Sequence, residues 1–189
     1  MATIHKGENE LKEQAKQYFR LAIIFLAVPV IYIIAFLSQG YHFEGIYHLL
    51  PGIPLLIGSY FWNKYSALRS GIKGEEQTEN ILMDLPSDYD VFTSKRINTA
   101  EGNAEYDHII VGENGIFVVE VKNHNGTIVG DENEHQWTQH KVGRKGGQYT
   151  SRMRNPVKQV KRQVFILSTY LKQHEVPVWI EGIVFFSNP

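Results

Sequence analysis

The chain contains no cysteine, and its opposite charges nearly cancel. Without cysteine it forms no disulfide and has no thiolate for catalysis, which suits a reducing compartment. Nineteen Lys and Arg against 20 Asp and Glu give a formal net charge of −1, so overall charge does not indicate a nucleic-acid partner. With 43% hydrophobic and 21% charged residues, the 189-residue chain is globular in composition, with room for one domain and an appendage.

Several common signatures are also missing. The glycine-rich stretch 143–147 is not followed by Gly-Lys-Ser/Thr, so it is no P-loop. The histidines between positions 124 and 140 lack the spacing of zinc ligands and are interpreted as surface residues. The sequence has no internal repeat and no low-complexity linker, which excludes repeat architectures.

The first 70 residues differ in composition from the remainder. Residues 21–37 form an uninterrupted apolar run at the short end of what can span a bilayer. A second apolar stretch, residues 46–62, contains prolines and glycines, which membrane helices tolerate better than soluble ones. Lys and Arg flank the pair on its outer sides, whereas residues 38–45 have none. The pattern predicts that residues 1–70 cross the cell membrane twice, with both termini and the remaining domain in the cytoplasm.

Two other interpretations of these residues stay open. A basic start followed by an apolar run also begins a cleaved secretory signal, although here no small-residue cleavage site follows. A buried hairpin of a soluble protein is the other alternative, because His48, Pro51 and Pro54 weaken the second stretch as a membrane span. The second apolar stretch favours the membrane hairpin over a signal peptide.

From Gly71 onward the pattern predicts one compact α/β unit, residues 71–189. Asn114-Gly115 is a strong hairpin signal between two apolar strands, and Asn155 and Pro156 are typical of a helix start. The predicted elements are, in chain order, a helix (72–85), three strands (91–97, 108–111 and 116–119), a helix from Pro156 and a strand (178–187). The order is α-β-β-β-α-β.

The hairpin decides which side chains meet. If Asn114 and Gly115 form its loop, Asp107 pairs with Lys122 and Ile109 pairs with Glu120. Because side chains alternate along a strand, two carboxylates and one ammonium then share a face. Such a cluster is costly among β-branched residues unless it is paired or binds a cation, so it predicts a functional site. A three-residue loop would move Asp107 to the other face.

These elements and residues resemble the core of the PD-(D/E)xK nuclease superfamily, which has a restriction-endonuclease-like fold. Within it, residues 71–189 resemble the nuclease-related domain family. The stretches that match are Gly74-Glu75-Glu76, Asp107-His108, Glu120-Val121-Lys122-Asn123, Trp137-Thr138-Gln139 and Asn155-Pro156 with Gln159. Tyr106 stands where the superfamily has proline before the aspartate. Glu-x-Lys alone occurs by chance. The resemblance depends on its combination with an apolar strand, a preceding Asp on the same face and the order of the elements.

The resemblance implies metal-assisted hydrolysis of a phosphodiester. Asp107 and Glu120, together with the carbonyl of Val121 and with Glu75, would bind Mg²⁺ or Mn²⁺ through oxygen ligands. The metal would lower the pKa of a bound water and offset charge on the phosphate. Lys122 would position that water or stabilise the developing charge. The same residues could also form a structural ion cluster without catalysis.

Two further candidates lie on the predicted helices. Glu75 is chosen over Glu76 because it shares a helical stripe with Thr78 and Leu82, although acidic residues are also ordinary at a helix start. Gln159 would orient a phosphate or the nucleophile, or it could merely border the apolar stripe of its helix.

A basic stretch without acidic residues extends from Lys141 to Arg162. Such a stretch predicts contacts with a nucleic-acid backbone, with DNA favoured over RNA, although solvated loops carry similar charge. The candidate binding residues are Lys141, Arg144, Lys145, Arg152, Arg154 and Lys158.

Three classes of function follow. The sequence favours a membrane-anchored, metal-dependent nuclease that acts on DNA or RNA. A catalytically weak or inactive nucleic-acid-binding module is the second class. The third is a membrane scaffold in which Asp107 and Glu120 serve structure only.

Overall fold

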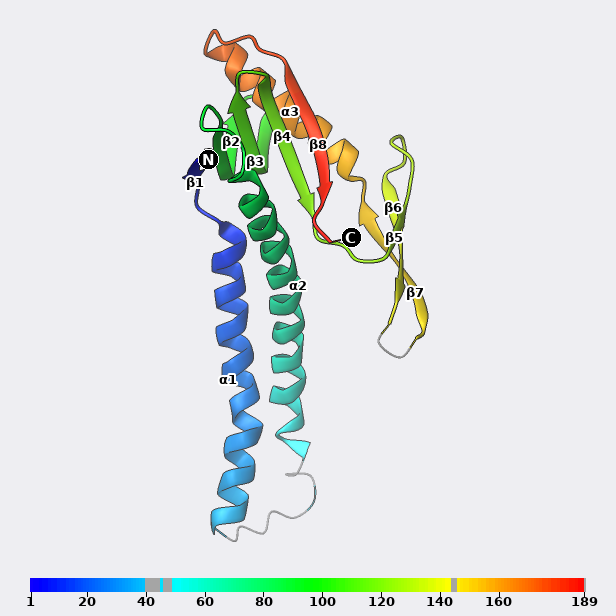
Figure 1. The fold of residues 1–189 in the computed structure, drawn as a ribbon. Helices are drawn as coiled ribbons and strands as arrows, with labels where there is room; N and C mark the ends of the chain where they lie inside the picture. Colours follow the sequence, from blue (N-terminus) through cyan, green and yellow to red (C-terminus); the bar gives the residue numbers. More distant parts are fainter. Residues whose placement is uncertain (40–44, 46–48, 144–145, 189) are drawn as a thin grey trace. The chain divides into compact units, whose positions relative to one another are not determined.

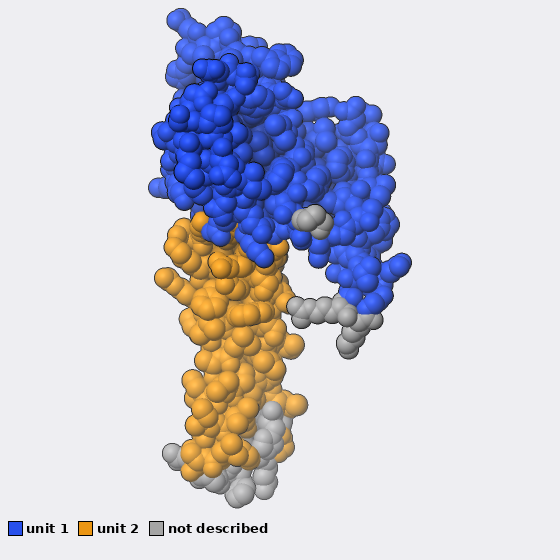
Figure 2. Space-filling model, viewed as in Figure 1, with its two compact units in different colours: residues 1–9, 73–189 blue, residues 10–72 orange. Residues whose placement is uncertain are grey.

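The computed structural model describes residues 1–39, 45, 49–143 and 146–188 (Figure 1). The chain divides into two compact units (Figure 2). The first unit combines residues 1–9 with residues 73–189, and the second consists of residues 10–72. In the part of the chain that the structure describes, the protein is mixed α/β, with a sheet core and three helices.

The second unit is a pair of helices that lie side by side in opposite directions (Figure 1). Helix α1 (Glu10–Gln39) packs against the first part of α2 (Gly52–Leu82). The ring of Phe61 on α2 lies 6.0 Å from that of Tyr18 and 5.9 Å from that of Phe25 on α1. At Gly58 a Cβ would lie 2.7 Å from the side chain of Leu26, so the glycine permits close approach of the helices.

The described residues contain one helix, α1, that is long and apolar enough to cross a membrane. The prediction of two spans is therefore not confirmed. Residues 46–48 of the second predicted span lie outside the described residues. The remainder opens α2, where polar and charged residues follow from Asn63 onward.

The first unit is built on a five-stranded sheet with the order β1-β2-β3-β4-β8. β1 and β8 run parallel to their neighbours, and the other two strand pairs are antiparallel. The strands are β1 (Thr3–Lys6), β2 (Asp90–Thr99), β3 (Gly102–Gly112), β4 (Gly115–Lys122) and β8 (Ile180–Phe186). The predicted α-β-β-β-α-β order is found among α2, the main-sheet strands β2, β3, β4 and β8, and the helix after residue 155, whereas β1 and three short strands between β4 and that helix were not predicted.

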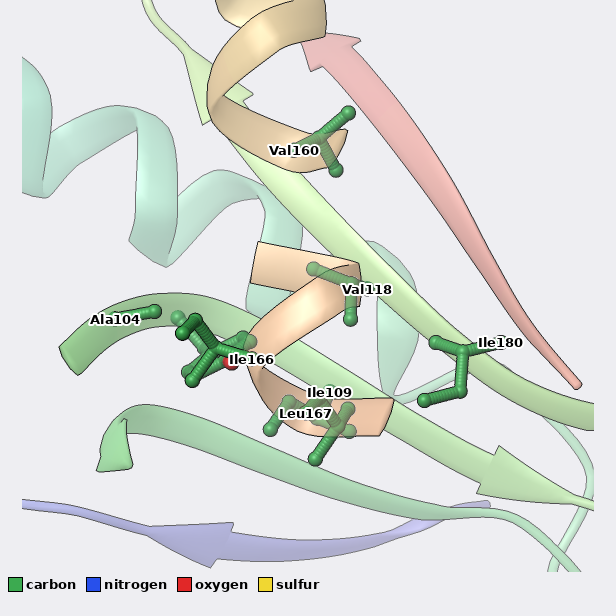
Figure 3. Packing of buried hydrophobic residues seen from close by; sticks show 8 residues of the cluster. Ala104, Ile109, Val118, Val160, Ile166, Leu167 and Ile180 are labelled. Carbon is green, nitrogen blue, oxygen red and sulfur yellow. The ribbon is translucent and has the colours of Figure 1, made fainter. Parts of the chain in front are cut away.

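Helix α3 (Pro156–Gln173) packs on one face of this sheet. Figure 3 shows its apolar side chains against those of the strands, and the cluster includes Ala104, Ile109, Val118, Val160, Ile166, Leu167 and Ile180. The predicted helix start is confirmed, since the Asn155 side chain accepts hydrogen bonds from the amides of Val157 and Lys158. On the other face, Val91, Ile110 and Val119 pack with Leu82 of α2.

The β3–β4 hairpin has a two-residue loop, but not the predicted one. Gly112 pairs with Gly115, so Glu113 and Asn114 form the loop. Gly115 has a positive φ of 120° at the start of β4, whereas neither loop residue has a positive φ. The turn is therefore not type I′, and the conformational freedom of the glycine is used in the strand.

This register corrects the predicted partners by two positions. Ile109 pairs with Val118, not with Glu120. The backbone pairing ends at His108 and Val119, and beyond it Oδ2 of Asp107 accepts a hydrogen bond from the amide of Val121, so Asp107 does not pair with Lys122. Because the loop still has two residues, the parity of the paired parts of the two strands is as predicted.

A second, three-stranded antiparallel sheet lies between β4 and α3, where the sequence pattern predicted no helix or strand. Its strands are β5 (Thr127–Val129), β6 (Gln136–Val142) and β7 (Gln148–Arg154). Trp137 of β6 donates a 2.8 Å hydrogen bond from Nε1 to the carbonyl of Asp131 and lies against Gly130, where a Cβ would come within 2.1 Å of its ring. Trp137 is thus a packing residue of this sheet.

Candidate active site

Glu75 reaches the sheet because α2 passes very close to the ends of two strands. At Gly74 a Cβ would lie 2.6 Å from the Cβ of Asn123 and 2.8 Å from Oγ of Ser187. Glu75 is half-buried beside this contact, whereas Glu76 is exposed. Thr78 is buried and Leu82 is half-buried on the same side of α2 as Glu75, as predicted. The charge of Glu75 lies near enough to Asp107 to raise the pKa of the Asp107 carboxyl group.

Asp107 and Glu120 bring two carboxyl groups together at the centre of the sheet. One carboxylate oxygen of Asp107, Oδ2, accepts a 2.7 Å hydrogen bond from the amide of Val121. Burial is the main cause that raises the pKa of Asp107 above its ordinary value of 3.8, and the charge of Glu120 adds to it. The Val121 amide and the Lys122 ammonium oppose the shift. Two close carboxyl groups with too little positive charge form a site that favours a cation.

Glu120 is 2% exposed, and both of its carboxylate oxygens are engaged. The ammonium of Lys122 donates to Oε1, and Nε2 of Gln163 donates to Oε2 at 2.6 Å. Lys122 also donates to Oε1 of Gln159 at 3.1 Å. Helix α3 therefore supplies two amides, from Gln159 and Gln163, that hold the Glu-x-Lys pair of β4 in place.

Gln163 was not identified from the sequence. It lies four residues after Gln159, so both amides project from one face of α3, and that spacing was the available signal. Nε2 also donates to the carbonyl of Glu105 at 2.8 Å. Its Oε1 atom is buried without a hydrogen-bond partner among the described residues. A buried acceptor of this kind suits an ordered water beside the carboxylates.

The donor set fits a hard divalent cation that keeps part of its water shell. Within the described residues, no three His, Cys, Asp or Glu side chains form a ready-made ligand group. Mg²⁺ commonly binds proteins through one or two carboxylates and several waters, which Asp107 and Glu120 can provide with the carbonyl of Val121. The raised pKa of Asp107 and the orphaned Oε1 of Gln163 agree with this use of the site.

Two further polar residues, Asn9 and His108, lie near Glu75. The Nδ2 atom of Asn9 donates a 2.9 Å hydrogen bond to Oε2 of Glu75. This contact was not predicted, because Asn9 precedes the apolar run and lies far from Glu75 in the chain. His108 is 1% exposed, and neither ring nitrogen has a hydrogen-bond partner among the described residues. Burial lowers the pKa of His108 to about 4, while the charge of Glu79 and the backbone of Glu75 act weakly in the other direction.

The predicted nucleic-acid-binding residues do not form one surface. Arg144 and Lys145 lie outside the described residues. Arg152 and Arg154 are exposed and alternate on β7, so they share a face of the small sheet. Lys141 pairs with Tyr149 on the opposite face and borders a hollow of about 770 Å³.

Lys158 is turned away from these residues toward the acidic loop before β6. Its ammonium donates to the carbonyl of Asn133 at 2.6 Å. One turn along α3, Lys161 pairs with Glu132 at 2.9 Å. These two ammonium groups thus hold α3 to the loop.

Comparison with known proteins identifies the family of this chain. The family model of the nuclease-related domain matches residues 70–187. An uncharacterized protein of Bacillus anthracis is 39% identical over 71 residues, which cover 36% of this chain and 34% of that protein. The match thus spans about a third of the length of this relative. No solved structure matches the chain significantly. The chain belongs to the nuclease-related domain family.

Proposed function

We propose that the protein is a membrane-anchored, metal-dependent nuclease that hydrolyses phosphodiester bonds of DNA or RNA, with DNA as the favoured substrate. The observation that carries this proposal is the meeting of the Asp107 and Glu120 carboxyl groups, with Lys122 bound to Glu120. The α-β-β-β-α-β order around the pair supports a restriction-endonuclease-like core.

In this proposal the chain supplies a metal site and a cation for the phosphate. Asp107, Glu120 and the Val121 carbonyl hold Mg²⁺ or Mn²⁺, with Glu75 as a further ligand. A metal ion held there would supply a water of lowered pKa and positive charge opposite the phosphate. Lys122 compensates the paired carboxylates and stabilises the charge that develops on the phosphate oxygens. Gln159 orients the Lys122 ammonium through their 3.1 Å hydrogen bond.

Nicking of supercoiled plasmid tests the catalytic proposal. The purified chain with Mg²⁺ or Mn²⁺ is expected to nick, and Asp107→Ala and Lys122→Ala are expected to remove the activity. Glu105→Ala is a matched control, because the Glu105 side chain lies exposed on β3 and pairs with Arg96. Equal nicking by wild type and by both site variants would refute catalysis at this site.

Nucleic-acid binding without efficient cleavage is a second candidate. The observation that favours it is the engagement of both Glu120 oxygens by Lys122 and Gln163, which a metal would have to rearrange. A pure binder would show salt-dependent binding that persists in Asp107→Ala. The same binding would disappear when Arg152 and Arg154 are neutralised together with Arg144 and Lys145.

We further propose that α1 and the start of α2 form the membrane anchor, with both termini and the nuclease-related domain in the cytoplasm. Large apolar side chains along both helices are exposed, which is costly in water and favourable in lipid. They are Ile23, Ile24, Val30, Ile31, Ile33, Ile34 and Leu37 on α1, and Ile53, Leu55 and Leu56 on α2. Phe61 holds the two helices together through Tyr18 and Phe25.

Single cysteines test this topology directly, because the chain has none of its own. A membrane-impermeant maleimide added to intact cells is expected to label Ser38→Cys, at the end of α1. Glu101→Cys, in the turn after β2, should react only after the cells are permeabilised. Labelling of Glu101→Cys on intact cells would show that the proposed orientation is wrong.

A further inference from the structure

The first nine residues belong to the same compact unit as the proposed active site. β1 runs parallel to β2, with Ile4 opposite Val91 and Lys6 opposite Thr93. The pairing continues past the strand, since the amide of Gly7 donates to the carbonyl of Thr93 at 2.8 Å. The segment that precedes α1 is thus fixed along the edge of the main sheet.

Gly7 and Ser94 form a close crossing at the end of this pairing. A Cβ at Gly7 would lie 2.2 Å from the carbonyl oxygen of Ser94 and 2.7 Å from that of Thr93. Contacts this short exclude any side chain at position 7 without movement of the backbone. Ser94 itself has a positive φ of 50°, which is uncommon for a non-glycine residue. The backbone is therefore specialised at the point where the segment crosses β2.

On either side of the crossing, the segment contacts an acidic side chain of α2. Asn9 donates from Nδ2 to Oε2 of Glu75 at 2.9 Å and to Oγ of Ser94 at 3.1 Å. Lys6 pairs with Glu79 at 2.7 Å, one helical turn after Glu75. Both contacts are made within the unit that contains Asp107. The hydrogen bond from Asn9 acts directly on the Glu75 carboxylate and so restricts how it can turn toward the site.

We propose that Asn9 is a positioning residue of the nuclease site, which acts by holding the Glu75 carboxylate toward Asp107. The inference rests on the proposed nuclease function. Donation from Asn9 to Oε2 restricts the direction in which the Glu75 carboxylate points. Asn9 lies outside residues 70–187, the part matched by the family, so the site of this chain extends to its amino-terminal segment.

Calorimetry of Mn²⁺ binding to the full chain in detergent tests the role of Asn9. Partners that orient metal ligands commonly contribute 10- to 100-fold to affinity, and we expect Asn9→Ala to weaken binding by roughly tenfold. Asn9→Asp keeps the size of the side chain but loses the donor, and it should weaken binding as well. Glu8→Ala is the matched control, because Glu8 is exposed next to Asn9 and should leave affinity unchanged.

A double-mutant cycle separates positioning from a general structural effect. In the Glu75→Gln background, Asn9→Ala should add little further loss, because the carboxylate that Asn9 orients is already gone. An equal loss in both backgrounds would overturn the inference. Undiminished Mn²⁺ binding by Asn9→Ala would overturn it too, while leaving the nuclease proposal intact. A wild type that binds no Mn²⁺ would instead overturn the nuclease proposal, and the role of Asn9 with it.

Discussion

The side-chain amide of Gln163 lies 2.6 Å from Oε2 of Glu120 and 2.8 Å from the carbonyl oxygen of Glu105, so one amide joins α3 to two neighbouring strands. The side chains of Gln163 and Glu120 are both buried, and Gln163 is 3% exposed. A buried carboxylate depends on such donors, because removing one leaves charge without compensation. Gln163 therefore has both a structural and a ligand-orienting role.

Gln163→Met should lower the free energy of unfolding by about 2 kcal/mol, because it removes a hydrogen bond to a charged group at nearly constant volume. It should also weaken Mn²⁺ binding by roughly tenfold through the loss of a ligand-orienting partner. Denaturant unfolding and calorimetry measure the two effects. Lys161→Ala, which breaks an exposed pair with Glu132 on the same helix, is the control. If Gln163→Met lowers the free energy of unfolding by the same amount in a Glu120→Gln background as in wild type, the hydrogen bond to Glu120 is not the cause of the loss.

The raised pKa of Asp107 predicts a pH-dependent cost to stability. The folded chain retains this proton at pH values where the unfolded chain has lost it, so stability falls as pH rises above 3.8 through the folded pKa. Without metal, Asp107→Asn should therefore raise the melting temperature by a few degrees more at pH 8 than at pH 5.

Metal should reverse this effect, because a divalent cation favours the ionised carboxyl group. Addition of Mg²⁺ at pH 8 is expected to raise the melting temperature of wild type but not that of Asp107→Asn. Differential scanning fluorimetry follows both proteins, with Glu105→Gln as the exposed control on the same strand. Equal responses of wild type and Asp107→Asn to Mg²⁺ would place the ion elsewhere.

Because His108 is buried, we expect the chain to lose stability in acid. Burial lowers its pKa to about 4, so between its ordinary value of 6.5 and about 4 the unfolded chain binds a proton that the folded chain does not. The contribution of His108 to the free energy of unfolding is therefore complete above pH 6.5 and decreases by up to about 3 kcal/mol as the pH falls to 4. Urea unfolding at pH 7.5 and pH 5 should show a smaller pH effect for His108→Leu than for wild type, whereas exposed His135→Ala should behave as wild type.

The features that the sequence predicted well depend on residues near one another in the chain. Asn155 and Pro156 define the start of α3 through local hydrogen bonds. The two-residue hairpin loop preserved the parity of β3 and β4, although its register was wrong. Glycine can take a positive φ either inside a turn or just after it, so Asn114-Gly115 predicted a hairpin without deciding its exact pairs.

The features that the sequence missed depend on tertiary contacts. β1 is short and precedes an apolar helix, so nothing local relates it to β2, which lies far along the chain. Asn9 and Gln163 acquire their roles only when the sheet brings Glu75 and Glu120 beside them. The small sheet was missed because its strands are polar on both faces and lack an apolar alternation.

The basic residues of the carboxy-terminal half divide into two groups with different surroundings. Arg152 and Arg154 project from one exposed face of β7. Lys158 and Lys161 are held by the carbonyl of Asn133 and by Glu132. Ammonium groups already engaged by the protein release fewer counterions when a phosphate approaches, so the arginines should contribute more to binding.

Neutralising both arginines, as Arg152→Gln with Arg154→Gln, should therefore weaken DNA binding and flatten its salt dependence. If each arginine contacts one phosphate of a duplex, the slope of log K against log salt should decrease in magnitude by about 1.8. The matched pair Lys158→Gln with Lys161→Gln removes the same charge and should change the slope less. Fluorescence anisotropy of a labelled duplex measures the slopes, in an Asp107→Ala background that prevents cleavage. A larger change in the lysine pair would place the binding surface on α3 instead of on β7.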